Sequence, residues 1–317
     1  MLEVVDAGLH ATIQDGGRTG YAHLGVAYAG AADRLALAVA NALLEGDPDA
    51  PALEMTLTGG TFRVLVDTTL AIAGADMGAL VLEEGRPLGP AARHRVASGT
   101  TLAFGAARDG ARTVLALPGG IDAERVLGSA STDPVGGFGG LGRGPVVHGD
   151  VLRPLRAVGA AASAREWPPT VPSSGVATLP GPHEIALLPG PHLDRLPAST
   201  ADVLASTIWT VSAHSDRVGL RLEGPPIGGE RPPLASLPML PGAVQLPSGG
   251  QPIVLMPDAP TVGGYPVVAV VVGVDRPRLG QLRPGDEVRF RWVDAAAAAA
   301  WRRDADDRFA AVVARWA

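Results

Sequence analysis

Three short polar clusters set among glycines contain the side chains best suited to chemistry in this sequence. The first extends from Thr12 to Tyr21 and includes Gln14, Asp15 and Arg18. A carboxylate and a guanidinium three positions apart in a glycine-rich turn can form a bidentate ion pair, or they can hold a planar polar ligand. The pattern by itself leaves both interpretations open: an internal pair that stabilises the turn, and a ligand site.

The other two clusters lie at the start of a predicted helix and between two predicted strands. The segment 30–34 opens the helix and contains Asp33, whose carboxylate would complement the positive end of the helix macrodipole. The segment 258–266 supplies an acidic acceptor, a threonine hydroxyl and a tyrosine ring, and its paired glycines let the backbone approach a ligand. A structured hairpin connection is the alternative for this third cluster.

The basic residues of the chain exclude several kinds of cofactor and nucleophile chemistry. All 26 are arginine, because the sequence contains no lysine. A P-loop lysine, a Schiff-base lysine and a lysine carrying biotin, lipoate or pyridoxal phosphate are therefore excluded, and we expect no covalent cofactor on this chain. The absence of cysteine likewise excludes disulfides, thiolate zinc sites and cysteine nucleophiles.

Other common signatures are missing or lack their structural context. The seven histidines form no H-x-H or H-x-x-x-H pair, so we expect no metal site. Residues 137–142 match the dinucleotide fingerprint G-x-G-x-x-G, but the flanking sequences suit neither the strand nor the helix that the fingerprint needs. We expect a loop there instead. The net charge of −6, without a basic segment, favours no nucleic-acid partner.

Short β segments bounded by glycine and proline dominate the sequence, a pattern typical of barrels and sandwiches. A helix is predicted over 31–44, a short one around 200–206, and Asp294 is expected to cap a terminal helix. The predicted organisation is a first β-rich subdomain over 1–155, a Pro/Ala/Ser-rich linker over 156–182, a second β-rich subdomain over 183–294 and a C-terminal helix over 295–317. The longest apolar run is too short to span a bilayer and the N-terminus lacks the pattern of a signal peptide, so we expect a cytoplasmic protein that binds no membrane.

Many of these residues also match a known family, in order and with fitting spacing. In the first half the matches are Gln14-Asp15, Gly17-Arg18, Gly20-Tyr21, Asp33, Ala40-Asn41, Leu53-Glu54, Gly74-Ala75-Asp76, Gly119-Gly120-Ile121, Leu127 to Asp133 and Gly149-Asp150. In the second half they are Gly190-Pro191, Ser215 to Gly219, Arg221, Gly224, Gln245, Pro247, Gly249-Gly250, Asp258, Thr261, Gly263 to Pro266, Asp275, Gln281 and Pro284-Gly285. On these residues the chain resembles the family of 5-oxoprolinase C subunits. That family is also described as KipA-like, as allophanate hydrolase subunit 2, or as the C-terminal half of the carboxyltransferase domain in urea carboxylase.

The resemblance implies a fold and a role. The implied fold is mainly β, with two cyclophilin-like β-barrel subdomains, a few short helices and a C-terminal helix. The implied role is the C subunit of an ATP-dependent 5-oxoprolinase, a hydrolase complex that opens the lactam 5-oxoproline (pyroglutamate) to glutamate. Its partners would be a KipI-like B subunit, of the allophanate hydrolase subunit 1 type, and a lactam-utilisation A subunit, with ATP and Mg²⁺ bound at the level of the complex. This chain is expected to be inactive alone.

Two alternatives stay open beside this role. One is a biotin-dependent carboxyltransferase component that acts on urea or a similar amide, in which case the biotin must be on another chain because this one has no lysine. The other is a KipA-like regulator that binds a KipI-like kinase inhibitor without turnover.

Combined with the clusters, the resemblance leads to a set of candidate site residues in loops of both halves. The predicted catalytic residues are Asp15, Arg18, Asp258 and Tyr265. The predicted substrate-binding residues are Gln14, Asp33, Asn41, Gln245, Thr261, Gly263 and Gly264.

Overall fold

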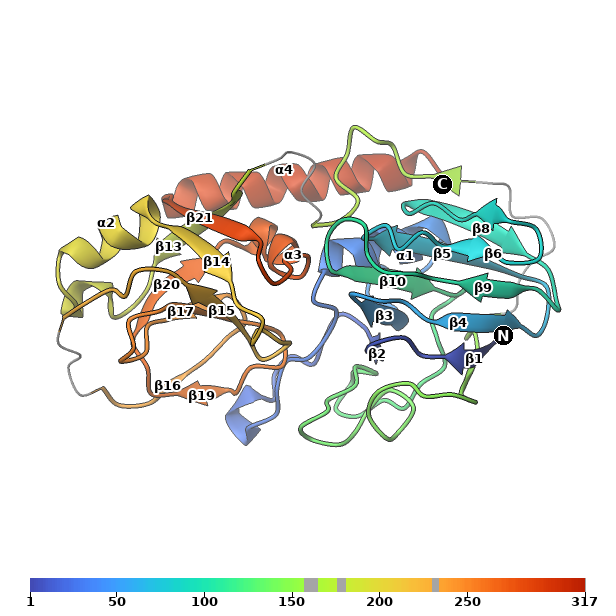
Figure 1. Ribbon diagram of the computed structural model, residues 1–317, viewed down its shortest axis with the longest axis horizontal. Helices are drawn as coiled ribbons and strands as arrows, with labels where there is room; N and C mark the ends of the chain where they lie inside the picture. Colours follow the sequence, from blue (N-terminus) through green and yellow to red (C-terminus); the bar gives the residue numbers. More distant parts are fainter. Residues whose placement is uncertain (157–164, 176–180, 230–233, 317) are drawn as a thin grey trace. The chain divides into compact units, whose positions relative to one another are not determined.

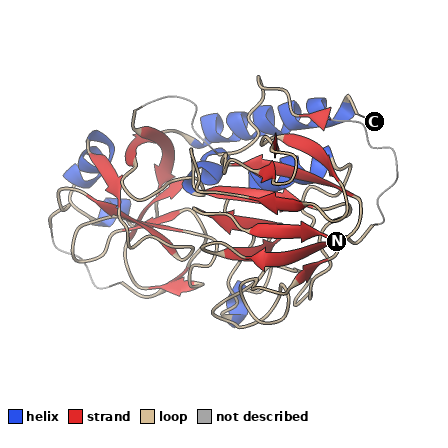
Figure 2. Cartoon of the chain, turned by 45° about the vertical axis from the view of Figure 1, so that its right-hand side comes forward, coloured by secondary structure: helices blue, strands red, loops and turns tan. Residues whose placement is uncertain are grey.

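The computed structural model describes residues 1–156, 165–175, 181–229 and 234–316. The chain divides into two compact units. The first unit comprises Met1–Arg18, Ala29–Val176 and Val312–Ala317, and the second comprises Thr19–Tyr28 and Ala177–Ala311. Figure 2 shows that strands and loops make up most of the chain and that helices are few.

Two six-stranded antiparallel sheets form the first unit (Figure 1). The first sheet has the order β11-β1-β4-β9-β6-β7, and its strands are β1 (Leu2–Asp6), β4 (Thr61–Val64), β6 (Leu80–Val81), β7 (Arg86–Pro87), β9 (Thr101–Ala103) and β11 (Val151–Leu152). The second has the order β12-β8-β5-β10-β3-β2, and its strands are β2 (Ala11–Gln14), β3 (Ala52–Thr56), β5 (Thr68–Gly74), β8 (Ala92–Val96), β10 (Arg112–Ala116) and β12 (Arg165–Glu166).

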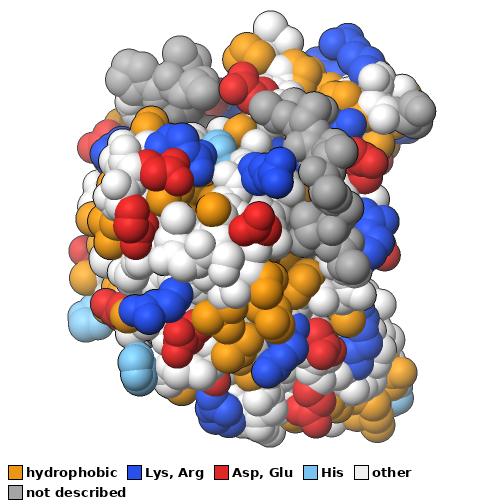
Figure 3. Space-filling model, turned by 90° about the vertical axis from the view of Figure 1, so that its right-hand side faces the viewer, with side chains coloured by type: hydrophobic (Ala, Val, Ile, Leu, Met, Phe, Trp, Pro, Cys, Tyr) orange, Lys and Arg blue, Asp and Glu red, His pale blue; other side chains and the backbone are white. Residues whose placement is uncertain are grey.

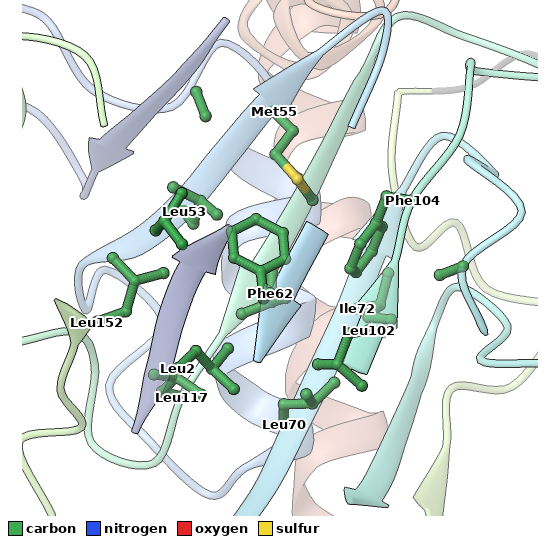
Figure 4. Close-up of a cluster of buried hydrophobic side chains, with 14 of the residues drawn as sticks. Leu2, Leu53, Met55, Phe62, Leu70, Ile72, Leu102, Phe104, Leu117 and Leu152 are labelled. Atoms are coloured by element: carbon green, nitrogen blue, oxygen red, sulfur yellow. The ribbon is translucent and has the colours of Figure 1, made fainter. Parts of the chain in front are cut away.

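The inner faces of these two sheets share one apolar core (Figure 4). Phe62 of β4 is fully buried at its centre and meets the ring of Phe104 edge to face, with 5.8 Å between the ring centroids. Side chains of the second sheet, including Leu53, Met55 and Ile72, complete the cluster. Burial of this apolar surface is the main force that holds the two sheets together.

Helix α1 (Arg34–Leu43) packs against β5, β8 and β10 of the second sheet. It begins three residues later than predicted, because Asp33 is its N-cap: the carboxylate accepts a hydrogen bond from the Ala36 N–H at 2.9 Å. The N–H groups of Ala31 and Ala32 bind the carbonyl of Asp15 and the carboxylate of Glu54, so these two residues lie outside the helix.

Part of the segment predicted as a linker over 156–182 lies outside the described residues. The described residues 165–175 belong to the first unit. There β12 pairs with β8, and the Trp167 side chain is buried and packs edge to face against Trp316 at 5.6 Å between ring centroids. A large aromatic side chain among small residues and prolines fixes this stretch to the first unit.

A closed barrel forms the second unit, with the order β13-β20-β17-β18-β15-β14-β21. The parallel pairing of β13 with β21 completes the closure. The barrel strands are β13 (His183–Pro189), β14 (Ile208–Val211), β15 (Gly219–Glu223), β17 (Ala243–Gln245), β18 (Ile253–Leu255), β20 (Val267–Val271) and β21 (Glu287–Trp292). A two-stranded ribbon of β16 (Leu237–Pro238) and β19 (Val262–Gly263) accompanies it, with helices α2 (Ser199–Ser206) and α3 (Arg276–Leu279).

Helix α4 (Ala295–Ala314) follows the barrel. The predicted cap is confirmed, since the Asp294 carboxylate accepts a hydrogen bond from the Ala297 N–H at 2.7 Å. An ion pair one turn apart, Arg302 with Asp306 at 2.8 Å, supports the exposed surface of α4.

In the described part of the chain no helix is both long and apolar enough to cross a membrane. Acidic, basic and apolar side chains are interspersed on the face shown in Figure 3.

The mainly-β fold with few helices and a C-terminal helix is therefore confirmed. The barrel of the second unit is closed, whereas the first unit consists of two sheets around a shared core.

Candidate functional site

The Asp15 carboxylate, which follows β2, is almost fully buried and accepts four hydrogen bonds. Oδ1 accepts from the Gly17 N–H at 2.8 Å and from the hydroxyls of Ser129 and Ser131 at 2.7 and 2.6 Å. Oδ2 accepts from the Ala130 N–H at 2.6 Å. Burial by itself would raise the pKa of Asp15, but these four hydrogen bonds outweigh it and lower the pKa below its ordinary value. Asp15 is thus held as an anion that organises the segment 129–131.

Arg18 binds the same segment through its guanidinium. Nε donates to the carbonyl of Val126 at 2.9 Å, and Nη2 donates to the carbonyl of Ser131 at 2.9 Å. The guanidinium also lies over the ring of Phe138, 4.8 Å from its centroid. Both predicted catalytic residues of the first unit therefore contact the stretch 126–131, which the sequence clusters did not single out as a partner.

The glycine-rich segment 137–142 packs against this stretch as a loop. A Cβ atom on Gly139 would lie 2.2 Å from the carbonyl oxygen of Ser131, and one on Gly140 would lie 2.3 Å from the hydroxyl of Thr132. The Thr132 N–H in turn donates to the carbonyl of Ile13 in β2 at 2.9 Å. The glycines are needed for close packing at the edge of the sheet, which explains a fingerprint-like sequence without the strand and helix of a dinucleotide site.

Gln14, Asp33 and Asn41 are buried and bind the chain's own backbone. Gln14 accepts from the Gly30 N–H at 3.0 Å and donates to the carbonyl of Thr132 at 3.2 Å. Besides capping α1, Asp33 accepts from the N–H of residue 175 at 2.7 Å. The Asn41 amide donates to the carbonyl of residue 50 at 2.8 Å. Their predicted contact with substrate stays a prediction, and what the geometry supports is the positioning of loops.

In the second unit, Asp258 is paired with Arg217. The guanidinium donates from Nε to Oδ2 at 2.7 Å and from Nη2 to Oδ1 at 2.9 Å, and both side chains are buried. The Asp258 N–H also donates to the carbonyl of Arg217 at 2.9 Å. This arrangement uses both carboxylate oxygens in a bidentate pair. Arg217 had no assigned role from the sequence, because a partner 41 positions away leaves no local pattern.

Gln245 and Gly263 lie together near the start of β18, whereas Asp258 follows the end of that strand. A Cβ atom on Gly263 would be 2.6 Å from the Gln245 amide nitrogen, so the two predicted substrate-binding residues are in direct contact. The same nitrogen donates to the sulfur of Met239 at 3.4 Å. Gln245 pairs with Ile253 at the start of β18. The Gln245–Gly263 contact thus lies beside the start of β18, and the Asp258–Arg217 pair follows its end.

The remaining candidates flank β19: Thr261 precedes it, and Gly264 and Tyr265 lie in the loop between β19 and β20. Tyr265 is 51% exposed, and Gly264 is exposed with ordinary packing around it. Thr261 is buried, and its carbonyl accepts from the Met239 N–H at 2.8 Å, which continues the pairing of the β16–β19 ribbon by one more hydrogen bond. Together, Gln245, the two glycines and Tyr265 offer an amide, accessible backbone and a phenol, a set suited to a small polar molecule. We call this group, Gln245 with residues 263–265, the barrel-end site.

The fold and the site together define a class of protein. It is mainly β, it combines a closed barrel with a two-sheet unit, and it carries a hydrogen-bonding loop at one end of the barrel. The family model for the carboxyltransferase domain, subdomain A and B, matches residues 24–292. The chain belongs to this family.

Relatives within the family carry two kinds of name. The chain is 36% identical to the 5-oxoprolinase C subunit of Escherichia coli over 92% of this chain and 90% of that protein. It is 31% identical to the 5-oxoprolinase C subunit of Haemophilus influenzae over 96% and 94%. It is 32% identical to urea amidolyase of Saccharomyces cerevisiae over 91% of this chain, but over only 16% of that protein.

A solved structure shows the same difference in how much of each relative the chain covers. The urea carboxylase of Kluyveromyces lactis superposes with a TM-score of 0.86 at 28% identity, covering 97% of this chain and 29% of that one. The chain thus corresponds to one part of the large urea enzymes and to nearly the full length of the 5-oxoprolinase C subunits.

Proposed function

We propose that this chain is the C subunit of a 5-oxoprolinase, a hydrolase complex that opens 5-oxoproline to glutamate with ATP. The observation that carries the proposal is reciprocal coverage: the match to 5-oxoprolinase C subunits extends over nine-tenths of both chains. The urea enzymes match through a fraction of their length, and the rest of their chains has no counterpart here.

The barrel-end site would bind the lactam. Ring opening places negative charge on the lactam oxygen, and fixed hydrogen-bond donors stabilise that charge. Gln245 supplies an amide, and the exposed phenol of Tyr265 supplies a hydroxyl that can move a proton or donate a hydrogen bond. The Arg217–Asp258 pair fixes the start of the segment 258–266, which carries Tyr265 near its end. Asp15 and Arg18 would act on the first unit's loops as positioning residues.

ATP with Mg²⁺ is part of the proposal at the level of the complex. In the described residues, no three His, Asp or Glu side chains come together as metal ligands. The sequence also has no lysine for a P-loop. Among the described residues, neither observation points to an ATP–Mg²⁺ site, so we assign nucleotide binding to a partner or to a shared surface and derive no step through it. The proposed partners are a KipI-like B subunit, of the allophanate hydrolase subunit 1 type, together with a lactam-utilisation A subunit.

Reconstitution tests this proposal directly. The chain is mixed with its KipI-like and lactam-utilisation partners, and glutamate and phosphate are measured with 5-oxoproline and ATP. We expect turnover only with all components present and none from this chain alone. Glutamate formation that does not need this chain would refute the proposal. Urea-dependent ATP hydrolysis with a biotinylated carrier protein would establish the carboxyltransferase alternative. Tight binding of the KipI-like protein without turnover would establish the regulatory one.

A further inference from the structure

His192 is a buried side chain beside the barrel-end site that the candidate set did not include. It follows β13 after the turn at Gly190, where a Cβ atom would lie 2.6 Å from the Val267 carbonyl oxygen. This close approach lets His192 pair with the first residue of β20. Its N–H donates to the Val267 carbonyl at 3.1 Å, and its ring nitrogen Nδ1 accepts from the Val267 N–H at 2.9 Å.

The bond to Val267 determines which ring nitrogen carries the proton. A backbone N–H can only donate, so Nδ1 must be unprotonated, and the neutral ring then carries its hydrogen on Nε2. Burial, with a smaller effect from the charge of Arg195, lowers the pKa of His192 below its ordinary value. Both effects favour a neutral imidazole with a fixed Nε2–H donor at physiological pH.

Nε2 is available for a ligand. His192 is 7% exposed, and Nε2 is neither hydrogen-bonded nor among the fully buried polar atoms without a partner in the described part of the chain. Its surroundings are those of the barrel-end site. Val267 pairs with Gln245 across β17 and β20, and it lies two positions after Tyr265. The Leu246 N–H binds the carbonyl of Pro266 at 2.9 Å, which holds the loop against the end of β17.

We propose that His192 is a further substrate-binding residue of the barrel-end site, whose neutral Nε2–H donates a hydrogen bond to an amide carbonyl oxygen of the substrate. The inference rests on the proposed function and deepens it. A neutral imidazole donor stabilises negative charge that develops on the oxygen without giving up its proton, provided that the ring is held in one tautomer. Val267 provides that restraint. The carbonyl would belong to the lactam 5-oxoproline or, in the carboxyltransferase alternative, to urea.

Two substitutions separate this role from a structural one. In His192→Asn the side-chain oxygen can take the place of Nδ1 as acceptor for Val267, while the Nε2–H donor is lost. In His192→Gln the amide reaches the position of Nε2 and the acceptor for Val267 is lost. We expect H192N to keep its melting temperature and partner binding but to lose about a hundredfold in kcat of the reconstituted complex. We expect H192Q to be less stable than H192N but to retain a larger share of the parent kcat.

Full turnover in H192N would overturn the inference, and so would turnover that follows melting temperature across both variants. A readout that does not need turnover is the ¹⁵N spectrum of histidine-labelled chain within the complex. It should show Nε2 of His192 protonated, and its signal should shift when 5-oxoproline is added, with urea as the second arm. A shift with urea only, in a complex that does not open 5-oxoproline, would refute the proposed function and keep the role of His192. No shift with either compound, in a complex that turns over, would refute the role of His192 alone.

Discussion

Arg217 meets Asp258 with two parallel N–H groups, at 2.7 Å from Nε to Oδ2 and 2.9 Å from Nη2 to Oδ1. Because both oxygens accept from a permanently charged guanidinium, the carboxylate is a counter-charge within the fold. Both carboxylate oxygens are engaged by the guanidinium. The pair supports a positioning role for Asp258 at the start of the segment 258–266, and its predicted catalytic role stays a prediction.

Replacing Asp258 by alanine tests this assignment through stability. The change removes the carboxylate that pairs with the buried Arg217 charge, and we expect a loss of about 3–5 kcal/mol in the free energy of unfolding. Urea denaturation of D258A, R217A and the double variant measures the coupling between the two side chains. The double variant should be less destabilised than the sum of the two single ones. Strict additivity, or D258A as stable as the parent and inactive, would restore a direct catalytic role for Asp258.

Gly263→Ala tests the contact at the barrel-end site. The new Cβ would meet the Gln245 amide nitrogen at 2.6 Å, so Gln245 must move away from its position. We expect turnover of the complex to fall about tenfold or more, with a loss of about 1 kcal/mol in stability from the tighter packing. Gly249→Ala is the matched control, because a Cβ there has nothing within 4 Å and the backbone φ is not positive. The variant Q245A/G263A should regain stability but not activity. Unchanged kinetics in G263A would show that the position of Gln245 is not critical.

The strands and helices that the sequence predicted are those with simple local signals. The segments rich in valine, leucine, isoleucine and threonine became β5, β10 and β20, and Asp294 caps the terminal helix. Two of the strands that local patterns missed, β3 and β8, have charged residues at buried positions. In β3 the buried residue Glu54 binds the Ala32 N–H at 2.7 Å, and in β8 the buried Arg93 donates to Glu45 at 3.1 Å. Such charges look like surface residues until their tertiary partners are known.

In the candidate site, too, local patterns did not reveal the tertiary partners of the residues. Local spacing singled out Asp15 and Arg18 as an ion pair in a turn or a ligand site, but their partners in the structure include Val126 to Ser131, more than 100 positions along the chain. His192 was missed because its function depends on one backbone hydrogen bond to Val267, 75 positions away. Without covariation between positions, a single sequence has no signal for such contacts. A glycine and proline before a histidine at the end of a predicted strand is the nearest local hint.

The lowered pKa of Asp15 predicts how the chain responds to acid. A carboxyl whose pKa is lower in the folded state stabilises the fold at pH values above its unfolded pKa of about 4, and this stabilisation is lost as pH falls through the folded value. We expect Ser131→Ala, which removes one donor to Oδ1, to raise the pKa of Asp15 and to move acid unfolding to higher pH. The Asp15→Asn variant should have a lower free energy of unfolding at pH 7, and that free energy should change less with pH below about pH 4. The unfolding free energy measured against pH gives both results, and curves parallel to the parent would contradict them.

Tyr265→Phe removes one oxygen from an exposed position and so isolates chemistry from folding. Since the side chain is 51% exposed, the loss of its hydroxyl should change stability by less than about 0.5 kcal/mol. If the phenol donates to the lactam or moves a proton, kcat of the reconstituted complex should fall about a hundredfold, with a smaller change in KM. Tyr28→Phe removes the same group from a half-buried tyrosine outside the barrel-end site and serves as the control. Equal kinetics for Y265F, Y28F and the parent would leave Tyr265 as a packing residue of the loop and shift the proton-transfer role to another component of the complex.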